Sequence, residues 1–342
     1  MLTFRKLRKV INRALLIFVI VGLMTIAYLT INPPNRLLTS SHWSISASTI
    51  PSDVLWEKTI PCLGTGYISP PIAISDQSLH IYDDCAGFDG AIVTLDLQTG
   101  EQQSRFRLRT VYQVYGIDEN ILVVFSDSYV TLLNSQNNQV WLSHRFESRS
   151  MRRIAVYDDL INAYINDFGT EGIEVISITD GSSIQSYDNP SILAVFSEFY
   201  VEYLSGSLLL HSFNGDEVQL QISETISVND KNNIYFDIHE NTLFTYIDNH
   251  MYAHDITTGE LNWARQGDYS SVPLLYDGII FVYQGQFNIT MYDAISGEIT
   301  GNIELERDIP LENAVWTALA IDDNFLAIAY RNLGEVVVIR IN

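Results

Sequence analysis

Arginine is the residue type whose distribution most suggests a binding site. Seven arginines fall in one stretch of the chain, namely Arg105, Arg107, Arg109, Arg145, Arg149, Arg152 and Arg153. The chain beyond Arg36 is otherwise acidic. A guanidinium group binds carboxylate or sulfate through two parallel hydrogen bonds. The stretch therefore indicates either a docking site for an acidic protein segment or an anionic glycan, or a set of solvated charges neutralised by nearby carboxylates.

The two cysteines of the chain are Cys62 and Cys85. In an oxidising compartment a disulfide between them is expected, and two free thiols are the alternative. No second Cys or His pair at zinc spacing accompanies them, so we expect no zinc site. The loop 83–90 contains three carboxylates and two glycines. Calcium could use such oxygen ligands, but the spacing is not that of an EF-hand and turn formation explains the residues as well.

The sequence shows no recognisable catalytic set. Each of the seven histidines stands without a nucleophile at a recognisable spacing, and no nucleophile elbow, phosphate loop or metalloprotease helix is present. We expect no catalytic residues, no bound cofactor and no metal. The formal net charge of -22 repels the phosphate backbone, so nucleic acid is not an expected partner.

The N-terminal part of the chain predicts a membrane anchor. Residues 1–13 carry five basic side chains and no acidic one, and residues 14–31 form an uncharged apolar run. Such a run can cross the hydrocarbon core as a helix, and the basic flank places 1–13 in the cytoplasm and the rest outside it. A cleaved signal peptide is the alternative, but no small-residue cleavage site directly follows the run. We expect a retained single-pass anchor in the cell membrane, followed by a linker over 32–52.

From residue 53 onward the chain repeats one unit seven times. Each unit has an apolar strand, a tight turn and a second strand that is often aromatic. The turns lie near Asp76, Asp118, Asp158, Ser197, Glu240, Asp277 and Asp322. This spacing matches the period of about 40–45 residues of a four-stranded propeller blade. We predict an all-β domain over 53–342, a seven-bladed β-propeller of four-stranded antiparallel blades.

The last unit has only three strands before the chain ends. Residues 53–60 resemble the outer-strand segment 260–266, so we expect them to pair beside the C-terminal strand around 336–341 and close the ring. Closure removes an open sheet edge. In the same scheme Arg105, Arg107 and Arg109 share one face of the outer strand of blade 1. The other four arginines flank the link between blades 2 and 3, and all seven would form a positive patch on one side of the ring.

One segment resembles a known repeat closely. Residues 251–263, MYAHDITTGELNW, resemble the tryptophan-docking repeat of PQQ-type (quinoprotein) propellers, whose fixed positions fall on Ala253, Asp255, Thr258, Gly259 and Trp263. The resemblance implies the propeller fold, and it implies that Asp255, Gly259 and Trp263 lock neighbouring blades. Quinoprotein dehydrogenases have eight blades and a disulfide between adjacent cysteines, whereas this chain has no Cys-Cys pair. This chain therefore resembles the family as a non-catalytic member, because it lacks these features of the dehydrogenases.

Taken together, these features predict a membrane-anchored, extracytoplasmic propeller that binds or scaffolds a protein or glycan partner. The alternative is a quinone- or metal-dependent enzyme with its site in the central channel. Propellers host many unrelated functions, so the fold alone does not choose between the two.

Overall fold

The computed structural model describes most of the chain from residue 43 onward. The described residues are 43–60, 63, 72–83, 90–108, 111–125, 129–134, 139–142, 150–167, 170–220, 234–247, 249–267, 269, 271–285, 287–307, 317–330 and 333–341. The predicted cytoplasmic segment 1–13 and the predicted anchor 14–31 lie outside them. Within the described part, no helix has the length and apolar character needed to cross a membrane.

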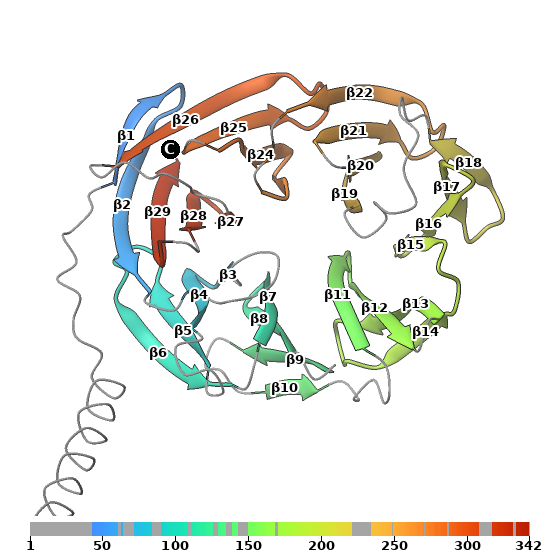
Figure 1. Ribbon diagram of the computed structural model, residues 1–342, viewed down its shortest axis with the longest axis horizontal. Coiled ribbons are helices and arrows are strands. Elements are labelled where there is room, and N and C mark those ends of the chain that lie inside the picture. The colour runs from blue at the N-terminus through green and yellow to red at the C-terminus, as the bar shows by residue number, and fades with distance from the viewer. Residues whose placement is uncertain are drawn as a thin grey trace, which may run out of the picture. The chain divides into compact units, whose positions relative to one another are not determined.

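The described strands form seven antiparallel sheets arranged around a central opening (Figure 1). We number the sheets as blades 1 to 7, in chain order from β3, and within each blade the first strand lies nearest the opening. Six blades have four strands and blade 6 has a fifth. The all-β, seven-bladed propeller predicted from the repeat is confirmed.

The strands of the first four blades follow one another along the chain. Blade 1 consists of β3 (Ile72–Ser75), β4 (Ser78–Asp83), β5 (Ala91–Asp96) and β6 (Gln102–Arg107). Blade 2 consists of β7 (Val111–Ile117), β8 (Asn120–Phe125), β9 (Tyr129–Asn134) and β10 (Gln139–Leu142). Blade 3 consists of β11 (Ser150–Tyr157), β12 (Leu160–Asp167), β13 (Thr170–Ser177) and β14 (Ser183–Tyr187). Blade 4 consists of β15 (Ile192–Val195), β16 (Phe199–Leu204), β17 (Ser207–Ser212) and β18 (Glu217–Leu220).

Blade 5 also consists of consecutive strands, namely β19 (Ile234–His239), β20 (Thr242–Ile247), β21 (His250–Asp255) and β22 (Leu261–Gln266).

The last two blades include strands from the start of the described chain. Blade 6 consists of β23 (Leu274–Tyr276), β24 (Ile279–Tyr283), β25 (Asn288–Asp293), β26 (Ile299–Arg307) and, outermost, β1 (Trp43–Ser48). Blade 7 consists of β27 (Thr317–Asp322), β28 (Phe325–Tyr330), β29 (Glu335–Ile341) and, outermost, β2 (Ser52–Thr59).

The core lies between the blades. In blade 1, Ile81 and Val93 pack in a cluster with blade 7, while Tyr82 and Ile92 on the opposite sheet face pack with blade 2. The middle strands are therefore buried on both faces, which explains their near-continuous apolar sequences. The outermost strand β6 is mostly exposed. Each blade consequently depends on a neighbour on either side to bury its apolar faces.

The strand β2 closes the ring. It pairs antiparallel with β29 along its length, from Ser52 opposite Ile341 to Thr59 opposite Glu335. This is the pairing that the sequence predicts for residues 53–60. The strand β2, from the N-terminal part of the described chain, and the C-terminal strand β29 thus meet in blade 7, and β29 has no free edge.

The predicted linker 32–52 is corrected at its C-terminal end. Residues 43–48 form β1, which pairs with β26 as the fifth strand of blade 6, and β2 already begins at Ser52. The strand was missed because Trp43 and Ile45 are its only large apolar residues, and the rest of 43–48 is Ser and Ala. That composition is as typical of a tether as of a strand.

Trp43 connects blades 6 and 7. Its ring stacks on Tyr330 of blade 7 at a centroid distance of 4.7 Å and meets Phe287 of blade 6 edge-on at 4.8 Å. Its indole nitrogen donates a hydrogen bond to Glu335 Oε2 at 3.0 Å, and Arg307 of β26 donates to the other oxygen of the same carboxylate. A single buried residue of β1 thereby fixes an aromatic cluster and an ion pair across the blade interface.

We predict that Trp43→Ala lowers the free energy of unfolding by about 3–5 kcal/mol, because it removes a buried ring and leaves Glu335 without the indole donor. Chemical denaturation of the purified protein measures this change. The control is Ser44→Ala on the exposed side of β1, expected to change the free energy by less than about 0.5 kcal/mol. Equal effects of the two substitutions would contradict this role of Trp43.

Candidate functional site

Trp263 locks blade 5 to blade 6. Its indole nitrogen donates to the carbonyl oxygen of Ala294 at 2.9 Å, and its ring lies against Gly297. A Cβ at Gly297 would come within 2.6 Å of the ring, and the backbone φ of +67° also favours glycine there. Trp263 of blade 5 therefore packs against the turn of blade 6 that contains Ala294 and Gly297.

Asp255 and Gly259 build the turn before Trp263. The Asp255 carboxylate accepts hydrogen bonds from the backbone N–H groups of Thr257 at 2.9 Å and Thr258 at 2.8 Å. These bonds hold the pKa of Asp255 below its ordinary value. Gly259 faces the previous blade, where an added Cβ would come within 2.4 Å of Val218. The turn of blade 5 therefore contacts blade 4 while its outer strand contacts blade 6.

Two further tryptophans make the same lock. Trp56 of β2 donates to the carbonyl oxygen of Leu97 at 2.9 Å and covers Gly100 of blade 1. Trp141 of β10 donates to the carbonyl oxygen of Ile178 at 2.7 Å and covers Gly181 of blade 3. The repeat pattern in the sequence identifies only Trp263 among the three tryptophans, because that pattern has its tryptophan and its glycine in the same repeat. In the structure, each tryptophan instead contacts the turn glycine of the next repeat.

The predicted arginine patch is only partly described. Arg105 and Arg107 lie on β6, both exposed, and Arg105 Nη1 contacts Asp83 Oδ2 at 2.8 Å. Among the described residues no ion pair forms with Arg107. The backbone of residues 152–153 belongs to β11, the innermost strand of blade 3, two blades further along. Arg109, Arg145 and Arg149 lie outside the described residues, so the patch as a whole stays a prediction.

The other sequence candidates are also incompletely described. Cys62 and Cys85 lie outside the described residues, and the disulfide stays a prediction. In the loop 83–90, Asp83 is the partner of Arg105, and residues 84–89 are outside the described part. No group of three His, Cys, Asp or Glu side chains that could hold a metal occurs among the described residues.

A cavity of about 390 Å³ occupies the centre of the ring. It is lined by inner-strand residues of blades 1, 2, 3, 5, 6 and 7, and most of its wall is apolar, with Val114, Val156 and Leu319 as examples. Among the described lining residues only Asp237 carries a charge. Sequence analysis missed Asp237, although a carboxyl group in the otherwise apolar first strand of a blade is a detectable signal.

Two polar side chains of blade 5, those of Asp237 and Tyr246, line this cavity. Burial raises the pKa of Asp237 to about 7, with a further contribution from the negative charge of Asp158, while a hydrogen bond from the Ile238 N–H at 2.9 Å opposes the rise. Tyr246, also in the wall, is 4% exposed and its hydroxyl has no hydrogen-bond partner among the described residues. Burial raises the pKa of this phenol well above its ordinary value. Unpartnered buried polar groups are rare in proteins.

His80 is a buried histidine away from the cavity wall. It is fully buried in blade 1, with its ring nitrogens 3.0 Å from Ser75 Oγ and 3.2 Å from Thr94 Oγ1. Burial lowers its pKa to about 4, so the imidazole is neutral at pH 7. Because Ser75 and Thr94 are buried together with His80, these hydroxyls are not accessible to a substrate, and we assign His80 a structural role.

The comparison with solved structures finds proteins similar to this chain, whereas the other comparisons find no match. No protein-family model matches the sequence, and no curated protein matches it significantly. Among solved structures, the chain is similar to the computationally designed protein Ika8, with 14% identity, a TM-score of 0.54 and coverage of 83% of this chain and 100% of that one. It is also similar to BamB from Moraxella catarrhalis, with 13% identity, a TM-score of 0.47 and coverage of 88% and 98%. At 14% identity, the likeness to Ika8 is one of fold alone.

We predict that Gly297→Ala is more destabilising than Gly215→Ala. Both glycines have positive φ, +67° and +97°, but an added Cβ at Gly215 has no atom within 4 Å. Gly215→Ala is expected to cost about 1 kcal/mol from backbone strain alone, and Gly297→Ala roughly 1–3 kcal/mol more from the clash with Trp263. Denaturant unfolding measures both. In a Trp263→Ala background the difference should vanish, and its persistence there would contradict the lock.

Proposed function

We propose that this protein is a PQQ-like, non-catalytic propeller that binds or scaffolds a protein partner outside the cytoplasm, held in the cell membrane by residues 14–31. The observation that carries the proposal is the outermost strand of blade 1, β6. It combines an open sheet edge with exposed arginines and an exposed aromatic ring. A glycan with sulfate or carboxylate groups is the other partner class that arginines bind.

The edge of β6 is available for pairing. Among the described strands β6 pairs only with β5, so its outer backbone groups have no strand partner. Blade 6 shows that a blade of this ring accepts a fifth strand, because five residues of β1 pair with β26. Extended peptides bind exposed edges in this way, with main-chain hydrogen bonds giving affinity. We infer that an extended segment of the partner adds to blade 1.

The side chains of β6 favour an acidic segment. Arg105 and Arg107 lie on one sheet face, and Phe106, 36% exposed, lies on the other. An added strand with carboxylates at alternate positions would place them beside the two arginines, and its apolar residues beside Phe106. The exposed guanidinium of Arg107, which has no ion-pair partner among the described residues, could bind both oxygens of one carboxylate.

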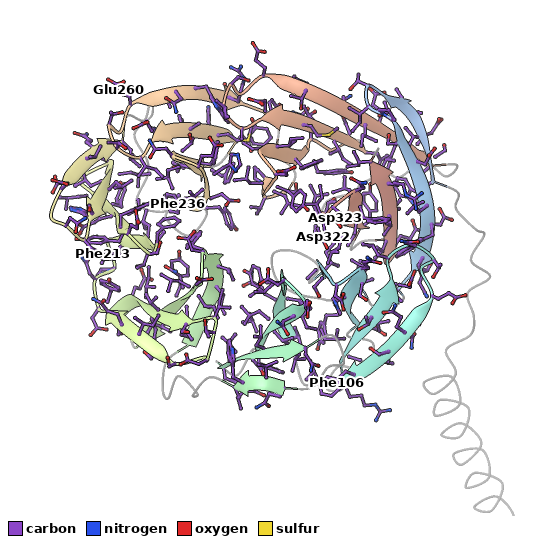
Figure 2. The ribbon with its side chains drawn as sticks, turned by 180° about the vertical axis from the view of Figure 1, so that it is seen from behind. Phe106, Phe213, Phe236, Glu260, Asp322 and Asp323 are labelled. Atoms are coloured by element: carbon purple, nitrogen blue, oxygen red, sulfur yellow. The ribbon has the colours of Figure 1, made fainter. Side chains whose placement is uncertain are left out.

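We predict that a photo-crosslinking amino acid in place of Phe106, in the full-length protein in its host membranes, captures a defined protein. The same probe in place of Phe213, 51% exposed on blade 4 and also at the outer margin of the ring (Figure 2), should not capture it. Arg107→Glu should abolish the product, because it replaces an attractive charge by a repulsive one. Mass spectrometry of the crosslinked bands measures both effects.

The control for added negative charge is Gln102→Glu at the other end of β6, which should leave the product unchanged. The same product from both probe positions, or a product that survives Arg107→Glu, would contradict docking on β6.

A further inference from the structure

One face of the ring is strongly acidic around the central opening. Because successive strands of a blade run in opposite directions, the turns from first to second strand all lie on one face, which we call the turn face. Six of these seven turns place an acidic residue in the left-handed conformation, with φ between 46° and 53°: Asp76, Asp118, Asp158, Glu240, Asp277 and Asp323. Asn or Gly would suit this backbone conformation as well, so turn geometry does not require the negative charge.

The cavity lies inside this ring of carboxylates. Its wall includes the ends of β3, β7 and β11 that lead into the turns at Asp76, Asp118 and Asp158. Figure 2 shows Asp322 and Asp323 at the inner margin of the ring, across the central opening from Phe236. The field of these carboxylates concentrates cations at this mouth of the cavity.

Among the described residues that line the cavity, Asp237 lacks a cationic partner and the Tyr246 hydroxyl lacks a hydrogen-bond partner. Among the described residues no Lys, Arg or His forms an ion pair with Asp237, and the charge of Asp158 disfavours its ionised form. The buried hydroxyl of Tyr246 has no hydrogen-bond partner in the part of the chain that the structure describes. The two side chains are diagonal neighbours on one face of β19 and β20, since Asp237 is opposite Phe244 and Tyr246 is opposite Tyr235. A cation placed between them would satisfy both.

We propose that the cavity binds a small organic amine, whose protonated amino group contacts Asp237 and Tyr246 and whose apolar body lies against the walls. An ammonium group has three N–H donors, so it can donate to the Asp237 carboxylate and to the Tyr246 hydroxyl oxygen at once. Its charge offsets the repulsion between Asp237 and Asp158. This site is separate from β6 and does not depend on the proposed partner.

The size and lining of the cavity fit an aromatic or branched amine. Its volume of about 390 Å³ lies at the lower end of small-molecule sites, which span about 300–1,000 Å³. The side chains of Phe236, Val156 and Leu319 provide apolar contact. A small amine with one ring fits these limits, whereas a folded protein segment does not.

The test uses the full-length purified protein and two probes of similar shape, phenethylamine and 2-phenylethanol, titrated by calorimetry. We expect the amine to bind at least ten times more tightly than the alcohol. Asp237→Asn should weaken amine binding at least tenfold, and Tyr246→Phe should weaken it several-fold. The control is Glu260→Gln, which removes one negative charge at the outer margin of blade 5 and should leave affinity unchanged (Figure 2).

The pH dependence gives a second measurement that needs no variant. Asp237 ionises near pH 7, whereas an alkylamine stays protonated below about pH 9. Amine affinity should therefore rise from pH 6 to pH 8, with Asp158 from blade 3 and Tyr246 of β20 as the titratable groups that face Asp237. Equal binding of the alcohol, a flat pH profile, or an Asp237→Asn protein that binds the amine like Glu260→Gln would overturn the proposal.

Discussion

Each blade of this protein is a sheet that is apolar on both faces, and only a neighbouring blade on each side can cover them. This constraint makes the ring obligatory, because an open row of blades would leave two apolar faces in water. The pairing of β2 with β29 meets the constraint, since it completes blade 7 with a strand from the N-terminal part of the described chain. The extra strand β1 extends the closure to blade 6, and Trp43 joins the two blades through one aromatic cluster.

The same constraint explains which contacts fix the register between neighbouring blades. Apolar faces that stack can slide or rotate, so the register between blades needs directional contacts. Three tryptophans of outermost strands provide them, each with an indole N–H bond to a carbonyl oxygen of the next blade and a ring against a turn glycine. Inner strands add further directional contacts, since the Tyr115 hydroxyl of blade 2 donates to the carbonyl oxygen of Ile154 in blade 3 at 2.8 Å.

The sequence was sufficient to predict the fold because its signals are local and repeated. A strand period, a turn residue such as Asp118 and a spacing of about 40 residues are all visible within one unit. The closing strand could be predicted because the last unit lacked one. Trp263 could be assigned because its repeat matches a known pattern.

What could not be predicted depends on contacts between distant parts of the chain. The strand β1 pairs with residues some 250 positions away, and nothing in its Ser-rich sequence indicates a partner. Trp56 and Trp141 lock onto glycines of the following repeat, so a comparison within one repeat does not find them. The cavity is formed by residues of six blades, and the raised pKa of Asp237 follows from that three-dimensional burial.

The most direct measurement of the central claim is hydrogen exchange by mass spectrometry on the full-length protein and on a form without residues 43–60. Blade 4 lies far from the closure around the ring (Figure 1). If the ring is one cooperative unit, removing β1 and β2 lowers amide protection in β15, β16 and β17 as well as in blades 6, 7 and 1. Loss of protection confined to the blades beside the deletion would contradict the account.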